Sequence, residues 1–98
     1  MRVITAQRIW EAKAKWPQSA KALDDWYRLI KGNRFADFAA MKAMFPAVDK
    51  VGPWHVFDVG GNKLRLIAVL RYTTQKLYIR FILDHREYDR GQWKEEWQ

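Results

Sequence analysis

Residues 54–83 read WHVFDVGGNKLRLIAVLRYTTQKLYIRFIL, and this stretch decides the fold. Apolar and polar residues alternate along much of it, as they do in a β-strand with one buried face. The Gly-Gly-Asn triplet at residues 60–62 predicts a hairpin turn, because such turns need positive φ angles. A second turn is expected at Thr73-Thr74. The stretch therefore predicts three consecutive antiparallel strands, at residues 54–59, 63–72 and 75–83.

Alternation assigns each side chain of these strands to one of two faces. One face is expected to be apolar and to pack against helices; it would hold Leu64, Leu66, Ala68 and Leu70 from the second strand and Leu77, Ile79, Phe81 and Leu83 from the third. The opposite face would hold Lys63, Arg65, Ile67, Val69 and Arg71, followed by Lys76, Tyr78, Arg80 and Ile82. This second face carries the cationic side chains of both strands.

The second face is expected to lack internal counter-ions, because no acidic residue occurs between Asp58 and Asp84. Arginine and lysine on a shared surface suit phosphate, since the guanidinium fork matches phosphate oxygens and the charge offsets the phosphate charge. The sequence therefore predicts a phosphate-binding face. An ordinary solvated face of a half-buried sheet remains the alternative.

The first half of the chain, residues 5–45, has helical periodicity instead. Thr5 is expected to cap a first helix, which should end at Trp16-Pro17 because a residue before proline avoids helical geometry. Its apolar face is expected to comprise Ile9, Trp10, the Lys13 stem and Trp16.

Two further helices are expected before the strands. The apolar face of the second would comprise Leu23, Trp26, Tyr27 and Ile30. Gly32-Asn33 is a suitable stop for it. The third would span residues 37–44, closed by Pro46, with a buried stripe of Phe38, Met41 and Phe45. Gly52-Pro53 then breaks the chain, residues 2–4 could add an edge strand, and residues 87–97 could form a short helix or an ordered tail.

These elements predict a single α+β domain over residues 1–98, with N-terminal helices packed on a small antiparallel sheet. Apolar residues make up 49% of the chain and aromatic residues 15%, which excludes intrinsic disorder. There is no cysteine and hence no disulfide framework. We expect a cytoplasmic protein without a membrane partner, because we find neither a signal-peptide pattern nor a long apolar run. The formal charge of +7 favours a polyanionic partner.

Groups suited to proton transfer follow the third strand, in the segment Asp84-His85-Arg86-Glu87-Tyr88-Asp89. Cleavage of RNA by transesterification needs a base for the 2′-hydroxyl, a cation for the phosphate and an acid for the leaving 5′-oxygen. Histidine, tyrosine, arginine and lysine can supply all three without a metal. The alternative is a purely structural role for His85 and Tyr88.

We expect no cofactor. The two histidines, His55 and His85, lie in no metal-binding spacing, and no paired carboxylates accompany them. Gly60-Gly61 lacks the following helix that a nucleotide-binding loop requires. His55 is expected on the first strand, where it could face either way.

The chain resembles the HigB toxins of bacterial toxin–antitoxin pairs, which are similar to the RelE-like ribonucleases. The matching stretches cover nearly the whole chain: Ile4-Thr5, Trp16-Pro17, Met44-Phe45-Pro46 with Val48-Asp49, the run from Val56 to Ala68, Tyr78-Ile79-Arg80, and His85 with Glu87-Tyr88-Asp89. One departure is Asp84, which stands where the family often has threonine.

The resemblance implies an mRNA interferase, a metal-independent endoribonuclease that cuts messenger RNA on the ribosome. It also implies a HigA-like helix-turn-helix antitoxin as partner, and operator DNA bound only through the complex of the two. In this hypothesis the catalytic residues are Arg80, His85, Tyr88 and Arg65, and the RNA-binding residues are Lys63, Lys76, Arg71 and Tyr78.

Two other classes of function remain open from the sequence. A non-catalytic nucleic-acid-binding module would keep the basic face but not need His85 or Arg80. An adaptor would use the same face to dock an acidic protein.

Overall fold

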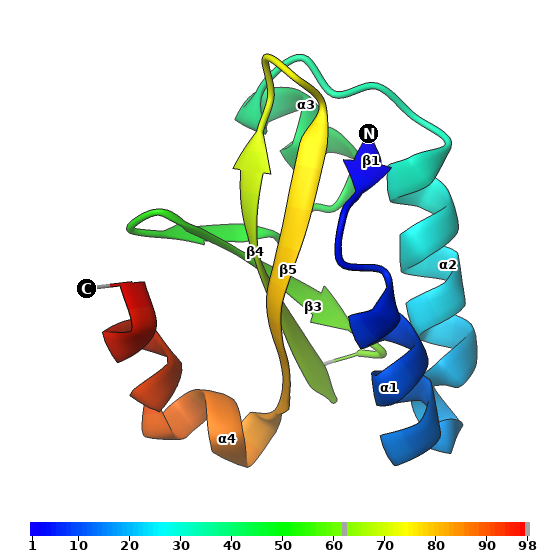
Figure 1. Ribbon diagram of the computed structural model, residues 1–98, viewed down its shortest axis with the longest axis vertical. Coiled ribbons are helices and arrows are strands. Elements are labelled where there is room, and N and C mark those ends of the chain that lie inside the picture. The colour runs from blue at the N-terminus through cyan, green and yellow to red at the C-terminus, as the bar shows by residue number, and fades with distance from the viewer. Residues whose placement is uncertain (62, 98) are drawn as a thin grey trace.

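The computed structural model of the chain describes residues 1–61 and 63–97, without the side chains of residues 95–97 (Figure 1). In chain order the elements are β1 (Arg2–Val3), α1 (Gln7–Lys15), the 3₁₀ turn η1 (Pro17–Ser19), α2 (Ala20–Lys31), α3 (Phe38–Met44), β2 (Asp49–Val51), β3 (Trp54–Val59), β4 (Leu64–Arg71), β5 (Lys76–Asp84), α4 (His85–Arg90) and η2 (Gln92–Trp97). The α+β class is confirmed.

The strands form one five-stranded sheet in the order β1-β5-β4-β3-β2. Strands β2 to β5 are antiparallel neighbours, as the turn signals predict, whereas β1 runs parallel to β5. Gly60 and Gly61 have φ angles of 72° and 59°, so the turn after β3 uses the positive φ that the sequence predicts. Asn62, the third residue of that signal, lies outside the described residues.

Helices α1, α2 and α3 cover one face of this sheet, and α1 and α2 lie side by side on it (Figure 1). Their buried side chains include Ile9, Leu23 and Ile30. These pack against sheet residues such as Phe57 and Leu66 to form the main core. The predicted stop of α1 is confirmed, since its last residue, Lys15, directly precedes Trp16-Pro17.

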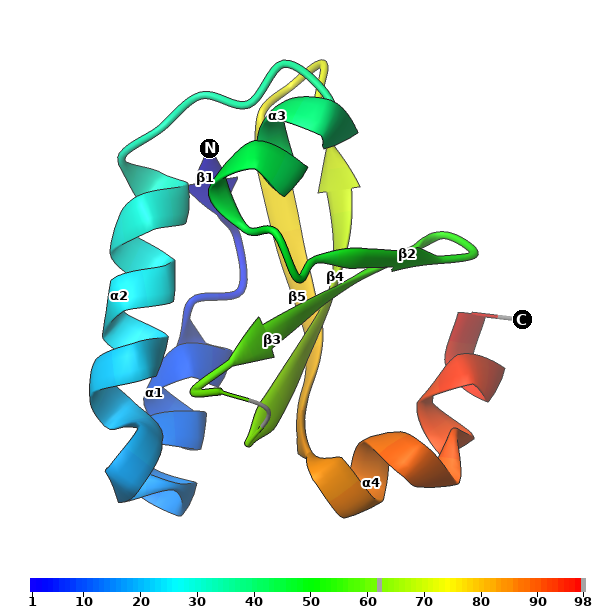
Figure 2. The same cartoon turned by 180° about the vertical axis from the view of Figure 1, so that it is seen from behind.

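A second, smaller core lies on the opposite face. It contains Trp54, Val56, Ile67 and Trp93, with Phe81 and other partly buried side chains against it. Trp93 reaches this face because α4 and η2 turn away from the end of β5, on the side of the sheet away from α1 and α2 (Figure 2). The C-terminal segment therefore packs on the face that the sequence predicts to be basic.

Strand β5 contains a β-bulge, which changes the core that its last residues join. Ile67 pairs with Phe81 and Ala68 with Ile79, so Arg80 is an extra residue between two regular pairs. The bulge reverses the alternation: Phe81 and Leu83 join the second core, and Ile82 joins the main one. The predicted faces of these three residues were therefore wrong.

Two expectations for the N-terminal region were also wrong. Thr5 does not cap α1, whose N-cap is Ala6. Its hydroxyl instead accepts a hydrogen bond from the Ile79 amide (2.6 Å) and donates one to the Ile79 carbonyl (3.1 Å), which ties the segment to β5. Trp10 is 48% exposed rather than buried, and Ala12 takes the buried position on that face of α1.

The remaining differences from the prediction are one additional strand and an earlier start of the C-terminal helix. Strand β2 was not predicted, and it pairs with β3 across the Gly52-Pro53 turn. Helix α4 begins at His85, two residues earlier than expected. Within the described part of the chain, every helix is too short or too polar to cross a membrane.

Candidate functional site

Arg80 projects from the β-bulge onto the second face of the sheet. Its guanidinium carbon lies 6.0 Å from the centre of the Trp54 ring, within the range of a cation–π contact. The predicted position of Arg80 on the face opposite the helices is therefore confirmed. Alternation from Ile79, which lies in the main core, places it there, and the bulge changes the faces of the residues that follow.

A row of aromatic rings connects Arg80 to Arg65 across this face. Trp54 contacts Trp93 edge to face, with 6.3 Å between ring centres, and Trp93 stacks on Tyr88 at 5.2 Å and 16°. The guanidinium carbon of Arg65 lies 5.5 Å from the centre of the Tyr88 ring. Each end of the row thus carries an arginine whose charge is held against a ring face.

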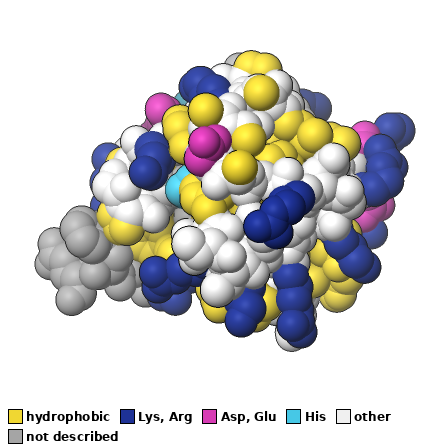
Figure 3. Space-filling view, turned by 90° about the horizontal axis from the view of Figure 1, so that it is seen from above, with side chains coloured by type: hydrophobic (Ala, Val, Ile, Leu, Met, Phe, Trp, Pro, Cys, Tyr) yellow, Lys and Arg dark blue, Asp and Glu magenta, His cyan; other side chains and the backbone are white. Residues whose placement is uncertain are grey.

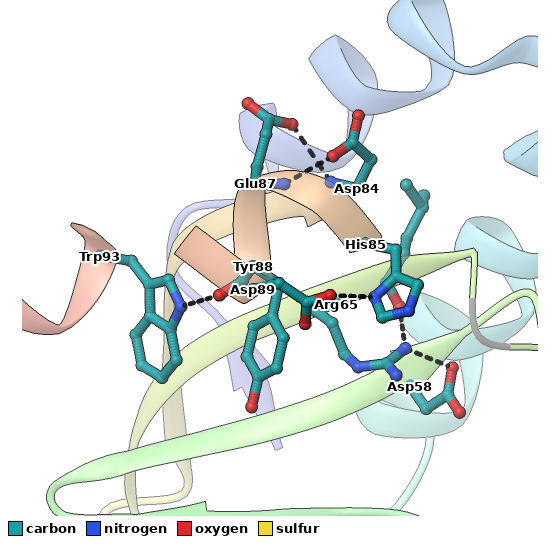
Figure 4. A network of polar contacts seen from close by, with 9 residues as sticks. Asp58, Arg65, Asp84, His85, Glu87, Tyr88, Asp89 and Trp93 are labelled. Carbon is teal, nitrogen blue, oxygen red and sulfur yellow. Dashed lines mark hydrogen bonds and ion pairs between the residues drawn. The ribbon is translucent and has the colours of Figure 1, made fainter. Parts of the chain in front are cut away.

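Arg65 also has a carboxylate partner, contrary to the expectation of a face without counter-ions. Its Nη1 lies 3.1 Å from Oδ1 of Asp58, its cross-strand neighbour on β3 (Figure 4). The two side chains are only 17% and 21% exposed. A charge-assisted hydrogen bond in such a half-buried place fixes the guanidinium. Arg65 is therefore oriented before any substrate arrives.

Tyr88 lies between Trp93 and Arg65 in Figure 4. Its backbone carbonyl accepts a hydrogen bond from the Trp93 indole nitrogen at 3.1 Å. Burial raises the pKa of the Tyr88 phenol above its usual value, and the Arg65 charge lowers it less than burial raises it. The phenol is protonated at neutral pH and can donate a proton or a hydrogen bond.

His85 is the first residue of α4 and its side chain is 62% exposed. Its Nδ1 lies 3.2 Å from Oδ2 of Asp89, one helical turn later. Asp84 caps the helix by accepting from the Glu87 amide (2.8 Å), while the Glu87 carboxylate accepts from the Asp84 amide (3.2 Å). Asp84, the residue that departs from the HigB pattern, therefore stabilises the first turn of the helix that carries His85 and Tyr88.

Lys63 and His85 line the same open pocket, which has a volume of about 310 Å³. Among the described residues, no three His, Cys, Asp or Glu side chains form a group that could hold a metal ion. An exposed imidazole and a lysine thus line a pocket whose other walls include Trp16, Gln18 and Ser19, while a protonated phenol and an oriented guanidinium are in contact on the second face. These groups are suited to acid–base chemistry on a phosphodiester.

The comparison with protein families agrees with this chemistry. Residues 19–91 match the family model for HigB toxin, described as the RelE-like toxic component of a toxin–antitoxin system. The chain belongs to the HigB toxin family.

Individual HigB relatives match over most of their length. The mRNA interferase HigB of Escherichia coli O6:H1 is 36% identical over 93 residues, which cover 92% of this chain and 90% of the relative. The mRNA interferase HigB of Shigella flexneri is 36% identical over 92 residues, covering 91% and 88%. The family match at residues 19–91 contains α2, α3, strands β2 to β5 and α4.

The structure divides the predicted HigB site residues among three places. Arg65 and Tyr88 are in contact, and Lys63 and His85 line the neighbouring pocket. Arg80 lies at the other end of the aromatic row. The remaining three follow toward the β4–β5 turn, where Tyr78 pairs with Val69 and Lys76 pairs with Arg71. Arg71 is six residues from Arg65 along β4, about 20 Å in an extended strand, so the two cannot act on one phosphate.

Three residues of this face were not predicted as part of the site: Asp58, Trp54 and Trp93. Asp58 faces Arg65 because the hairpin closes with Val59 opposite Leu64, whereas the predicted strand bounds of 59 and 63 would have placed Asp58 opposite Leu64. Trp93 and Trp97 are the large apolar residues of the mostly polar segment 91–98, and Trp93 is 3% exposed. Tryptophan in a polar segment indicates that the segment packs against the rest of the protein.

His55 does not belong to this site. It packs among residues of the helical side, 5.5 Å from Phe38 between ring centres, and its Nε2 lies 2.8 Å from the Tyr72 hydroxyl. Burial, assisted by the charge of Lys50, lowers the pKa of His55 to about 4. Burial, assisted by the charge of Asp37, raises the pKa of Tyr72 to about 12. The pair is neutral at physiological pH.

We expect His55 to make folding sensitive to acid. Its pKa is lower in the folded protein than the usual value near 6.5, so between pH 6.5 and about 4 only the unfolded chain takes up the proton. Stability should fall through this window by roughly 3 kcal/mol. Urea unfolding at pH 7 and pH 4.5 measures the loss. The variant His55→Phe should lose markedly less stability between the two pH values, and an equal loss would contradict the assignment.

Proposed function

We propose that this chain is an mRNA interferase, a metal-independent endoribonuclease that cleaves messenger RNA while it is being translated. The observation that carries the proposal is the contact of the Arg65 guanidinium with the Tyr88 phenol, next to the pocket that holds His85. The HigB relatives named mRNA interferases support the same function. They do not favour a non-catalytic binding module or an adaptor.

The reaction would proceed by transesterification. A base removes the 2′-hydroxyl proton, the 2′-oxygen forms a bond to phosphorus, and the bond from phosphorus to the 5′-oxygen breaks as that oxygen receives a proton. The products are a 2′,3′-cyclic phosphate and a 5′-hydroxyl. Protein groups can supply each proton transfer and the charge stabilisation.

The geometry suggests a role for each group. If the Nδ1 proton of His85 points to Asp89, then Nε2 is the basic nitrogen and can accept the 2′-hydroxyl proton. Tyr88 is protonated at neutral pH and can donate to the leaving 5′-oxygen. Arg65 and Arg80 would stabilise negative charge on the scissile phosphate and on the phosphate next to it.

The remaining proposed partners follow from family membership. Lys63, Tyr78, Lys76 and Arg71 would contact the RNA on either side of the scissile bond. The ribosome would present the messenger RNA, in the cytoplasm, and an antitoxin with a helix-turn-helix domain would silence the toxin. Operator DNA would be bound only through the toxin–antitoxin complex.

Brief expression in a bacterial host tests the function. We expect growth arrest and new messenger RNA ends inside translated frames, because the toxin would cut only RNA that the ribosome presents. These ends should carry a 5′-hydroxyl, which is mapped by ligation that requires prior phosphorylation. Cleavage by the purified protein on programmed ribosomes should persist when the protein is stripped of divalent metal before assay.

The variant that tests the mechanism is His85→Ala, because the His85 side chain is exposed and contributes little to the core. It should be folded and should abolish the new ends. New ends bearing a 5′-phosphate would sink the mechanism, and normal growth with unchanged RNA would sink the function.

A further inference from the structure

Three cations stand in a row across the sheet near the β4–β5 turn. Arg2 of β1 is in register with Lys76 of β5, and Lys76 is in register with Arg71 of β4. Side chains of residues in register project from the same face of a sheet. The adjacent residues Val3, Leu77 and Leu70 all pack in the helical core, so the three cations project from the opposite face, which also carries Arg65.

This row is unfavourable for the folded chain by itself. Like charges placed directly opposite each other on neighbouring strands destabilise a sheet, and the row contains two such pairs in succession. In the described part of the chain, the ion pairs join other residues, such as Lys13 with Asp24 and Arg65 with Asp58. An external polyanion would relieve the repulsion.

An open pocket continues the row beyond the edge strand. It has a volume of about 660 Å³ and is lined by Arg2, Lys31 and Arg34 together with Tyr27, Thr74 and Gln75. Its lining contains no acidic residue. Figure 3, which looks onto this end of the molecule, shows Lys and Arg side chains spread over the surface with few acidic ones between them. The positive surface is therefore larger than the row.

We propose that Arg2, Lys76 and Arg71 bind the phosphodiester backbone of RNA as an anchor separate from the catalytic groups. The choice of RNA rests on the proposed function. Because Arg71 lies about 20 Å from Arg65 along β4, the anchor contributes affinity and not chemistry. The backbone could belong to the messenger RNA or to ribosomal RNA, since both present the same phosphates.

The test neutralises the row in one variant, Arg2→Gln/Arg71→Gln/Lys76→Gln. A matched control, Arg8→Gln/Lys15→Gln/Lys21→Gln, removes the same charge from exposed positions on the helical layer. Lys31 and Arg34 are left in place so that the variant removes only the charges of the row. Binding is measured with a labelled 2′-O-methyl RNA, which cannot be cleaved, and with ribosomes free of messenger RNA.

We expect the row variant to bind at least one of the two RNAs about tenfold more weakly than the control does. The slope of log K against log salt should become shallower by about 2, since each phosphate contact on a single strand contributes about 0.7. Weaker binding to the oligonucleotide assigns the row to messenger RNA, and weaker binding to ribosomes assigns it to ribosomal RNA.

The melting temperature distinguishes an anchor from a structural role. Removing a self-repelling row should leave it unchanged or raise it. A lower melting temperature, or RNA binding equal to that of the control on both substrates, overturns the proposal. The proposal is also overturned if the row variant loses binding only to a polyglutamate peptide, because the row would then recognise an acidic protein and not RNA. Because the binding assays need no cleavage, an inactive protein that still binds RNA through the row would refute only the proposed function.

Discussion

Replacing Arg65 with alanine is expected to slow RNA cleavage by about 10² to 10³-fold, the usual cost of removing one preorganised group that stabilises a developing negative charge. Arg65 is oriented in advance by Asp58 at 3.1 Å and by the face of Tyr88 at 5.5 Å. The effect should fall on the rate at saturating substrate more than on binding. Single-turnover cleavage on programmed ribosomes measures it.

Two companion variants separate charge from geometry. Arg65→Lys keeps the charge but loses the planar fork, so it should recover only a minor part of the rate. Arg28→Ala removes an exposed arginine from α2 and should leave the rate unchanged. Full activity in Arg65→Lys would show that only the charge matters, and full activity in Arg65→Ala would exclude Arg65 from the site.

Replacing Trp93 with alanine should release the C-terminal segment from the sheet. Trp93 is 3% exposed, stacks on Tyr88 and donates to its carbonyl, so the change removes the main contact between η2 and the second core. Truncation of a buried aromatic side chain costs about 3–5 kcal/mol. We expect cleavage to fall by at least about 100-fold, since a displacement of catalytic groups by only about 1 Å has that effect.

The control is Trp10→Ala, because Trp10 is 48% exposed on α1. It should change stability and cleavage only slightly. Hydrogen exchange provides a second readout: in Trp93→Ala, amides of residues 84–91 should exchange faster while those of β4 remain protected. Unchanged exchange in α4 would mean that other contacts hold the segment.

Much of this fold follows from periodicity in the sequence. The helical stripes of α2 and α3 each match a single buried face, and Gly60-Gly61 marks the turn between β3 and β4. The period-two pattern predicts these two strands as well, although both contribute side chains to both cores. Strand β2 escaped prediction because three residues are too few to show alternation. Its partners come from β3, so pairing and not local pattern creates it.

The candidate site was only partly predictable for a related reason. Residue chemistry indicated Arg65, His85 and Tyr88 as candidates, and the structure places the Arg65 guanidinium against the Tyr88 ring. Two contacts depend on long-range register: Asp58 reaches Arg65 only because of the length of the intervening turn, and Trp93 reaches the sheet only because α4 folds back. Neither register is encoded in a local pattern.

The bulge in β5 has an evolutionary consequence. If Arg80 were absent, Ile79, Phe81 and Ile82 would alternate regularly, and each would keep the core in which it now lies. Arg80 is therefore an extra residue in an otherwise regular pairing of β4 with β5. One added codon can supply the cation without repacking either core, and one deleted codon can remove it at little cost to the fold. Relatives that differ here should differ by a one-residue gap and not only by a substitution.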